Sequence, residues 1–455
     1  MPYDVTALRS RLEAIVGPDH VAAGTEANSP LAVDGVVPAL SVRPGTQDEV
    51  SKVVAACSAA GAAMIPRGGG TAMGIGNRPS RADAVILLDR LDRVVEFDPA
   101  NLCITVEAGV RLGALQEKIA SDGEVLPIDP PDDEKVTMGG LVAANQSGPS
   151  RLLYGTARDF VLGMRVVLPD GERVHCGGRT IKNVSGYDMN KLFIKSFGTL
   201  GIVTEVTVKL LPAPVMRAGV VGLFPTLSQA TAAVTRTLES FLLPEALDLL
   251  DPAAMDLLAP RLELGAPGGA HGVAVALAGS RSTVERQARD FETLFRAEGA
   301  RVVPLPEART VSAWSSIRNV FGLLPPAPSR VVCKISVPID KGGAMLGAAG
   351  ADGKALGLQT AVFAHAGSGV VWAAFVLGGR PSEETVTGLQ RSLEALRQRA
   401  AAAGGSLVLC EAPPALKARM DAWGAPPPGL SVMKRIKSEY DPRALCSPGR
   451  YLGGM

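Results

Sequence analysis

The run Pro66-Arg67-Gly68-Gly69-Gly70-Thr71-Ala72 has the residue types of a loop that binds an anion through its backbone. Glycines lack a Cβ, so the chain can approach a ligand closely, and successive N–H groups can converge on a phosphate. No Lys-Ser or Lys-Thr follows, as a P-loop would require, and a strand-like run at 84–88 comes next where a dinucleotide fingerprint would open a helix. We therefore predict a phosphate or pyrophosphate loop between two strands; a flexible turn is the alternative.

Further glycine-rich motifs follow along the first half of the chain. They are Thr137-Met138-Gly139-Gly140 with Ala143 and Asn145, the run Tyr154-Gly155-Thr156-Ala157-Arg158-Asp159, and Gly198-Thr199-Leu200-Gly201-Ile202-Val203. A pyrophosphate needs several N–H donors and close backbone approach, and residues 67–72 and 137–140 supply both. Each motif is weak by itself, so their combination and order carry the inference.

The elements that must position these motifs form a globular, multidomain protein. The chain has 455 residues, 47% of them apolar, which predicts two or three domains. Its 46 basic and 45 acidic residues leave a net charge of +1, so nothing in the composition favours a nucleic acid or an anionic membrane as partner. The six cysteines form no C-x-x-C pair, which argues against an iron–sulfur cluster or structural zinc in this chain.

Hydrophobic periodicity predicts a helix at 47–61, a strand at 63–66, and a hairpin of 160–168 and 172–176. From 215 to 410, strand-like and helical runs alternate, which predicts an α+β domain with helices over one antiparallel sheet. The segment 342–350 reads as an Ala/Gly compositional bias. No stretch is apolar and long enough for a transmembrane helix, and we see no signal peptide, so we expect a cytoplasmic protein.

Taken in order, these motifs resemble the FAD-linked oxidases of the vanillyl-alcohol oxidase and p-cresol methylhydroxylase type. The element at 154–159 is similar to the family's YG-x-x-RD. Residues 182–193 are similar to KN-x-x-GYD-x-x-x-LF, and residues 198–205 are similar to GTLGI-x-TE. Within the family, the chain is most similar to the flavin-binding subunits of glycolate oxidase and to D-lactate dehydrogenase, and its ending around Arg450 resembles theirs.

The resemblance implies an α+β fold, with a two-subdomain FAD-binding domain of the p-cresol methylhydroxylase type and an α+β cap domain with an antiparallel sheet. The expected divisions are an N-terminal helical segment (1–37), the FAD-binding domain (38–214), the cap or substrate domain (215–410) and a C-terminal segment (411–455) returning to the FAD domain. Gly70 stands where the family often has a flavin-tethering histidine, so FAD should bind non-covalently. The expected FAD contacts are Pro66, Arg67, Gly68, Gly69, Gly70, Thr71, Ala72, Pro130, Thr137, Met138, Gly139, Gly140, Ala143, Asn145, Gly148, Tyr154, Gly155, Arg158, Gly201, Ile202, Val203 and Arg450.

The catalytic pattern of the 2-hydroxy-acid group is incomplete in this sequence. His365 is kept, but Trp372 stands at the second histidine, and Ala412 follows Glu411 where the family has a base histidine. His365 and Glu411 alone are too few ligands for a divalent ion, so we expect no metal. The catalytic residues stay open. The candidates are Arg318 for a substrate carboxylate, His365, and Tyr187, each with a structural alternative.

The incomplete site resembles the second flavin-binding subunit of glycolate oxidase complexes. The first hypothesis is therefore an FAD-binding oxidoreductase subunit whose flavin accepts or relays electrons from 2-hydroxy acid oxidation, beside a catalytic flavin subunit and an iron–sulfur subunit. Such a complex could hold the chain peripherally at the inner face of a membrane. The alternatives are a self-sufficient FAD-dependent glycolate or D-lactate dehydrogenase and a non-catalytic flavin-fold scaffold subunit.

Overall fold

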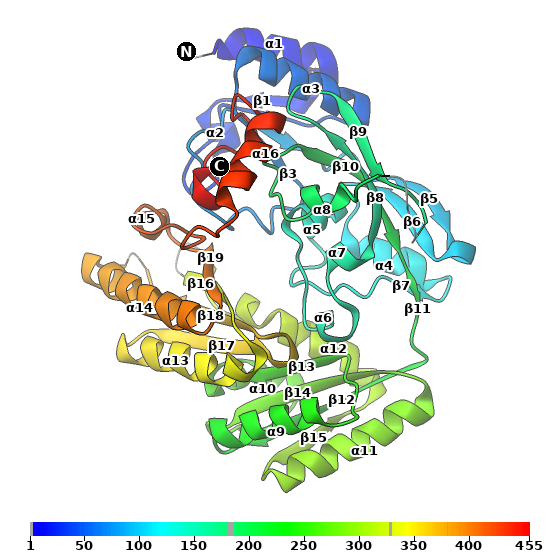
Figure 1. The fold of residues 1–455 in the computed structure, drawn as a ribbon, viewed down its shortest axis with the longest axis vertical. Coiled ribbons are helices and arrows are strands. Elements are labelled where there is room, and N and C mark those ends of the chain that lie inside the picture. Colours follow the sequence, from blue (N-terminus) through cyan, green and yellow to red (C-terminus); the bar gives the residue numbers. More distant parts are fainter. Residues whose placement is uncertain (1–2, 181–185, 327–329, 380) are drawn as a thin grey trace.

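The computed structural model describes residues 3–180, 186–326, 330–379 and 381–455. It has two parts, which lie one above the other in Figure 1: an upper part with two sheets and a lower part with a single large sheet. The predicted α+β fold class is confirmed. The motif at 182–188 falls partly on residues 181–185, which lie outside the described residues.

The first sheet of the upper part carries the glycine loop at the end of one strand. Its order is β1 (Val21–Ala23), β2 (Leu40–Val42), β4 (Ala84–Leu87) and β3 (Met64–Arg67). The helices packed beside it are α1 (Val5–Val16), α2 (Thr25–Asn28) and α3 (Gln47–Ala60). Thr46 caps α3 by accepting the Glu49 N–H at 3.1 Å, and Gly61, at φ +72°, ends it. Residues 1–37 are not only helical, because β1 joins this sheet.

The second sheet of the upper part is antiparallel. Its order is β5 (Val94–Asp98), β6 (Cys103–Glu107), β10 (Ile202–Lys209), β8 (Val161–Val167) and β9 (Arg173–Gly177). The predicted hairpin is confirmed as β8 and β9. Helices surround it, namely α4 (Leu112–Ala120), α5 (Met138–Ala144), α6 (Arg151–Tyr154), α7 (Ala157–Phe160) and α8 (Asn190–Phe193), with a small ladder of β7 (Glu124–Val125) and β11 (Leu211–Pro212).

The lower part is one antiparallel sheet of eight strands. Its order is β15 (Arg301–Leu305), β12 (Met216–Phe224), β14 (His271–Gly279), β13 (Ala246–Leu250), β17 (Gln359–His365), β18 (Val370–Val376), β16 (Arg330–Ser336) and β19 (Ser406–Glu411). One face packs against α9 (Leu227–Glu239), α11 (Arg281–Ala297), α13 (Gly342–Ala355) and α14 (Glu383–Ala402). The other packs against α10 (Pro252–Leu262) and α12 (Glu307–Arg318). Helices thus cover both faces.

Residues 342–350, in which the Ala/Gly bias predicted no element, lie in α13. Glycine is a poor helix former, so local propensity argues against this helix. Packing overrides propensity here: Met345, Leu346 and Ala349 are buried in the core between α13 and the sheet. The small residues also allow close approach, since a Cβ on Gly343 would lie 2.6 Å from the Thr231 hydroxyl of α9.

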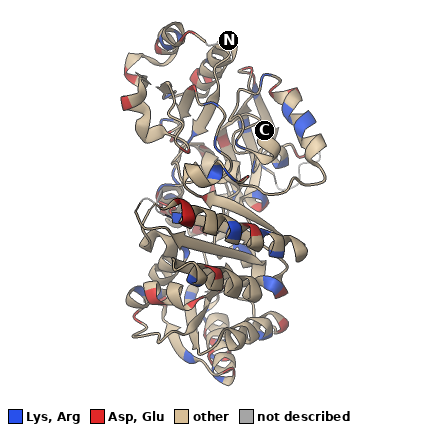
Figure 2. Ribbon diagram, turned by 90° about the vertical axis from the view of Figure 1, so that its left-hand side faces the viewer, with Lys and Arg blue, Asp and Glu red and all other residues tan. Residues whose placement is uncertain are grey.

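The C-terminal residues return to the upper part through α15 (Pro414–Lys417), which lies near α14, and α16 (Leu430–Tyr440), which Figure 1 shows in red beside the N-terminal elements. Cys446 forms a β-bridge with Met64 of β3. Figure 2 shows acidic and basic residues interspersed along the helices of the lower part. None of the helices in the described residues is long and apolar enough to cross a membrane.

Candidate functional site

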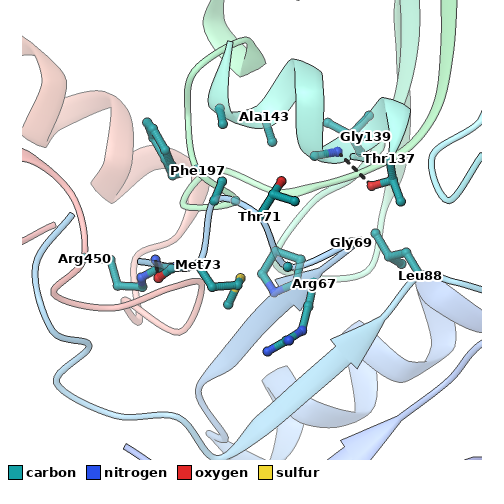
Figure 3. Close-up of a pocket in the computed structure, with 18 of the residues that line it drawn as sticks. Arg67, Gly69, Thr71, Met73, Leu88, Thr137, Gly139, Ala143, Phe197 and Arg450 are labelled. Carbon is teal, nitrogen blue, oxygen red and sulfur yellow. Dashed lines mark hydrogen bonds between the residues drawn. The ribbon is translucent and has the colours of Figure 1, made fainter. Parts of the chain in front are cut away.

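A cavity opens where the glycine loop after β3 faces the start of α5 (Figure 3). Both predicted glycine segments therefore lie on one site. The predicted residues that line it are Pro66, Arg67, Gly68, Gly69, Gly70, Thr71, Ala72, Thr137, Gly139, Gly140, Ala143, Gly201, Val203 and Arg450. Met73 and Gly198, which belong to the singled-out glycine segments but not to the expected FAD contacts, also line it, and the lining residues that the sequence reasoning missed are Leu88, Ala144 and Phe197.

The glycines of this cavity stand where the backbone passes too close for a side chain. A Cβ on Gly68 would overlap the Thr137 hydroxyl, and one on Gly69 would overlap the Lys135 carbonyl oxygen. Gly139 is similarly close to Ala108, with 2.7 Å between the added Cβ and the alanine methyl. The glycine loop thus packs tightly against residues 135–137, and its glycines leave bare backbone in the lining of the cavity, as a pyrophosphate requires.

Two guanidinium groups lie at this cavity. Arg450 is 4% exposed and donates to the carbonyls of Met73 at 2.6 Å and Ile75 at 2.9 Å, while its Nε has no partner within the described residues. Burial lowers the pKa of both Arg67 and Arg450. One buried and one partly buried cation beside bare backbone fit a pyrophosphate, because an anion would satisfy both.

An aromatic cluster joins the C-terminal residues to the wall of the cavity. Phe197 lines the cavity, and its ring centroid lies 5.2 Å from that of Trp423 and 5.8 Å from that of Tyr451. Trp423 also donates its indole N–H to the Arg450 carbonyl at 2.8 Å. These contacts hold the residues around Arg450 against the cavity.

A second cavity of about 430 Å³ adjoins the first and lies between the upper and lower parts. Gly70 and Thr71 line both cavities, so a ligand in one would border a ligand in the other. The second cavity brings together five residues that sequence reasoning singled out, namely Arg318, His365, Trp372, Glu411 and Ala412. They come from α12, β17, β18 and the end of β19.

Both arginines that line the second cavity are paired with carboxylates. Arg318 donates to the Asp133 carboxylate at 2.5 Å and keeps a buried Nε without a partner in the described residues. Arg330 donates to Glu411 at 2.9 Å. Glu411 is therefore engaged by an arginine. Among the described residues, no group of three or more His, Cys, Asp or Glu side chains could hold a metal ion.

A buried carboxyl lies close to this cavity. Asp129 accepts the Ser150 hydroxyl at 2.8 Å and the Ser150 N–H at 3.2 Å. Burial raises the pKa of Asp129 to about 6, whereas the hydrogen bonds from Ser150 and the nearby Arg318 and His365 act in the opposite direction.

The other predicted contacts lie away from the first cavity. Gly148 lines the second cavity. Asn145 and Arg158 line a third cavity, together with Lys195 and Ser196. Met138 and Ile202 are core residues, Pro130 is buried, Tyr154 packs against the core, and Gly155 adjoins Asp159. Direct FAD contact of these residues stays a prediction.

Tyr187 is placed apart from both adjoining cavities. Its side chain is 94% exposed, and it follows residues 181–185, which the structure does not describe. Of the three catalytic candidates, only Arg318 and His365 come together in one cavity. The geometry gives no support to a catalytic role of Tyr187.

Comparison with known proteins bears on both parts of the chain. Residues 38–177 match the family profile described as "FAD binding domain", and residues 214–451 match "FAD linked oxidases, C-terminal domain". The chain is 28% identical over 425 residues to glycolate oxidase subunit GlcD of Bacillus subtilis, covering 91% of this chain and 89% of the relative. It is 32% identical over 433 residues to an uncharacterised FAD-linked oxidoreductase of Mycobacterium tuberculosis, covering 91% of each.

A shorter match joins the chain to another subunit. It is 42% identical over 122 residues to glycolate oxidase subunit GlcE of Escherichia coli, covering 27% of this chain and 35% of the relative. Among solved structures, p-cresol methylhydroxylase with substrate bound superimposes with a TM-score of 0.79 at 16% identity, covering 98% of this chain and 96% of that one. The structural match shows a shared fold.

Proposed function

Because this chain belongs to the family of FAD-linked oxidases, we propose that it is the flavin-binding subunit of a glycolate-oxidase-like enzyme that oxidises 2-hydroxy acids. FAD is its cofactor, and the chain is an FAD-dependent oxidoreductase. The substrate class comes from the relatives: GlcD and GlcE are glycolate oxidase subunits, and another relative is a D-lactate dehydrogenase of Archaeoglobus fulgidus.

The observation that carries the proposal is the pair of adjoining cavities. The first has the backbone surfaces and guanidinium groups that suit the FAD pyrophosphate, and the second holds Arg318 and His365 beside the shared residues Gly70 and Thr71. A 2-hydroxy acid presents a carboxylate and a hydroxyl on adjacent carbons. A guanidinium suits the carboxylate and an imidazole suits the hydroxyl.

The residues of the two cavities have separable roles in this proposal. Gly68, Gly69 and Gly139 let the backbone reach the FAD, and Arg67 and Arg450 balance its charge without a covalent bond to the protein. Arg318 orients the substrate carboxylate. The bound FAD supplies the electron acceptor, which the protein side chains lack.

We further propose that electrons leave this chain through partner subunits, a second flavin subunit and an iron–sulfur subunit. Two relatives are named as subunits of glycolate oxidase, which supports an assembly of unlike chains. Any contact with a membrane would then come through the partners.

The purified chain tests the proposal directly. We expect a yellow protein whose FAD is released by denaturation, and whose absorbance in the flavin band falls when glycolate or D-lactate is added without oxygen. L-Lactate and propionate, which lacks the hydroxyl, serve as matched controls. Protein that binds FAD but is reduced only when the co-expressed partners are present would assign this chain to electron relay. Protein that cannot be loaded with FAD would contradict the proposal.

A further inference from the structure

A histidine and an aspartate from neighbouring strands meet at the wall of the second cavity. We propose that this pair, His365 and Asp248, is the proton-accepting unit for the substrate hydroxyl, with His365 as the acceptor and Asp248 as the residue that positions it. The inference rests on the proposed function and adds the residues that move the proton.

The sheet register places the two side chains opposite each other. Asp248 of β13 pairs directly with His365 of β17, and the distance from Asp248 Oδ1 to His365 Nδ1 is 2.9 Å. Asp248 is 0% exposed and His365 is 5% exposed. The imidazole also packs edge-to-face on Phe363, with 5.4 Å between ring centroids, so both contacts fix its orientation.

The apolar surroundings of Asp248 make its presence informative. Its strand reads Ala-Leu-Asp-Leu-Leu, all five residues are buried, and its Oδ2 has no hydrogen bond within the described residues. Burying a carboxyl with an unsatisfied oxygen costs roughly 1–3 kcal/mol or more, which a purely structural strand position would avoid by carrying an apolar side chain. Within the described residues, the His365 imidazole is the side chain that this carboxylate contacts by a hydrogen bond.

The pairing sets the tautomer of the imidazole. An ionised carboxylate only accepts hydrogen bonds, so the neutral ring carries its hydrogen on Nδ1 and leaves the Nε2 lone pair free. His365 lines the second cavity together with Arg318, and the structure shows no bond to Nε2 in the part of the chain that it describes. Nε2 is therefore the ring atom that a ligand in the cavity can reach.

Most other carboxylates at or beside this cavity accept hydrogen bonds from side chains. Asp133 accepts from Arg318, Glu411 from Arg330, Asp129 from Ser150, and Asp34 from Lys417. The exposed Asp132 carboxylate also lines the cavity, but an imidazole is ordinarily a stronger base than a carboxylate. His365 is thus the stronger base at this cavity.

The chemistry balances with FAD as oxidant. The hydroxyl O–H bond breaks and its proton goes to Nε2, which gives an imidazolium that the Asp248 carboxylate stabilises. The adjacent C–H bond breaks and its hydrogen leaves with the electron pair to the oxidant, while the C=O bond of the 2-oxo acid forms. Proton transfer to a positioned base is worth about 10²- to 10⁴-fold in rate.

Two measurements on the FAD-loaded protein test the pair. The first is the 15N NMR spectrum of histidine-labelled protein, which is tractable because the chain has four histidines. We expect the His365 signals to report hydrogen on Nδ1 in the wild type, to move when oxalate is added, and to report hydrogen on Nε2 in Asp248→Asn, because an asparagine amide can donate to Nδ1. His365→Gln assigns the signals.

The second measurement is the rate of flavin reduction by D-lactate or glycolate under anaerobic rapid mixing across pH. Asp248→Asn should lower the limiting rate about 100-fold or more, leave the substrate dissociation constant near the wild-type value, and change the pH profile. The matched control is Asp251→Asn, which alters another buried carboxyl one residue past β13 that caps α10 through the Ala254 N–H. The flavin of Asp251→Asn should be reduced at the wild-type rate.

The outcomes separate the two proposals. Hydrogen on Nε2 in the wild type, or wild-type reduction kinetics in Asp248→Asn, overturns the pair and leaves the proposed function standing. A wild-type flavin that no 2-hydroxy acid reduces overturns the proposed function, and the proton-acceptor role with it. If Asp248→Asn fails to bind FAD or shows no thermal unfolding transition, Asp248→Ser replaces it, and the tautomer of His365 in that variant is read from the same NMR signals.

Discussion

Replacing Gly69 by alanine tests the assignment of the glycine loop to FAD with one added methyl group. The added Cβ would overlap the Lys135 carbonyl oxygen, which is a backbone atom that no side-chain rotation can move away. The segment carrying Lys135 is anchored, since the Lys135 N–H donates to the Asp132 carbonyl at 2.8 Å and the Leu112 N–H donates to the Val136 carbonyl at 2.8 Å. The glycine loop must therefore shift, and its N–H groups shift with it.

The size of the effect follows from this overlap. Extra volume in a packed site costs about 1–3 kcal/mol, which corresponds to roughly a 5- to 150-fold weaker FAD affinity if the loop absorbs the strain in the bound state. The apoprotein is titrated with FAD, and the quenching of flavin fluorescence gives the dissociation constant. Thermal unfolding of the apoprotein measures how much strain the fold itself absorbs.

A matched substitution shows whether a change in FAD affinity comes from the glycine loop or from any replacement of glycine by alanine. Gly342 begins α13, and a Cβ added there meets nothing within 4 Å, so Gly342→Ala should leave FAD affinity unchanged. If Gly69→Ala folds like the wild type and binds FAD equally well, the loop does not contact FAD and the assignment of the first cavity is refuted.

Three further predictions concern the groups that surround the two cavities. Arg450→Met removes charged hydrogen bonds to the carbonyls of Met73 and Ile75 and should lower the free energy of unfolding by about 1.5–3 kcal/mol in urea titrations, whereas the same change at exposed Arg435 should have little effect. Lys417→Met leaves the Asp34 carboxylate, 2.8 Å from the lysine Nζ, buried without its partner, and we expect the free energy of unfolding to fall by about 3–5 kcal/mol in the same assay. The double variant with Asp34→Asn should recover part of this loss. If the ion pair contributes nothing, neither change will be seen. The pKa of Asp129 is raised to about 6, so the native state holds this proton between the ordinary value near 4 and pH 6. The contribution of the protonated carboxyl to stability is therefore complete below pH 4 and is lost as pH rises through 6, and urea unfolding should show a fall of up to about 1.4 kcal/mol per pH unit in that window. Asp129→Asn should abolish this fall, and an unchanged slope in the variant would show that Asp129 is not the group responsible.

The sequence predicted the local elements whose ends are marked by helix-capping or turn residues. Gly61 and Thr46 mark the ends of α3, and the Pro-Asp-Gly turn marks the hairpin of β8 and β9. It did not predict α13, because its glycines favour coil locally and only packing against α9 and the large sheet makes the helix stable. The strands β13, β15 and β19 were also missed, since short apolar runs resemble buried helix turns.

The site was predictable where motifs lie in one segment and not where they are completed across the fold. Residues 66–72 and 137–140 could be found because their composition is unusual. The partner of His365 lies 117 residues earlier, and its signal in the sequence is a single acidic residue inside an apolar strand. Phe197 gave no signal, because an aromatic residue in a loop usually packs in the core, and only its neighbours Trp423 and Tyr451 place it at the cavity.

The return of the C-terminal residues to the first cavity has a consequence for biosynthesis. Arg450 contacts Met73 across 377 residues, and Lys417 contacts Gly74 across 343. A ribosome-bound chain therefore emerges with its glycine loop long before the residues that complete the cavity. FAD can be captured in its final form only after Arg450 has left the ribosome. The slow, long-range closure is then the step at which cofactor supply decides between mature enzyme and a chain open to proteolysis.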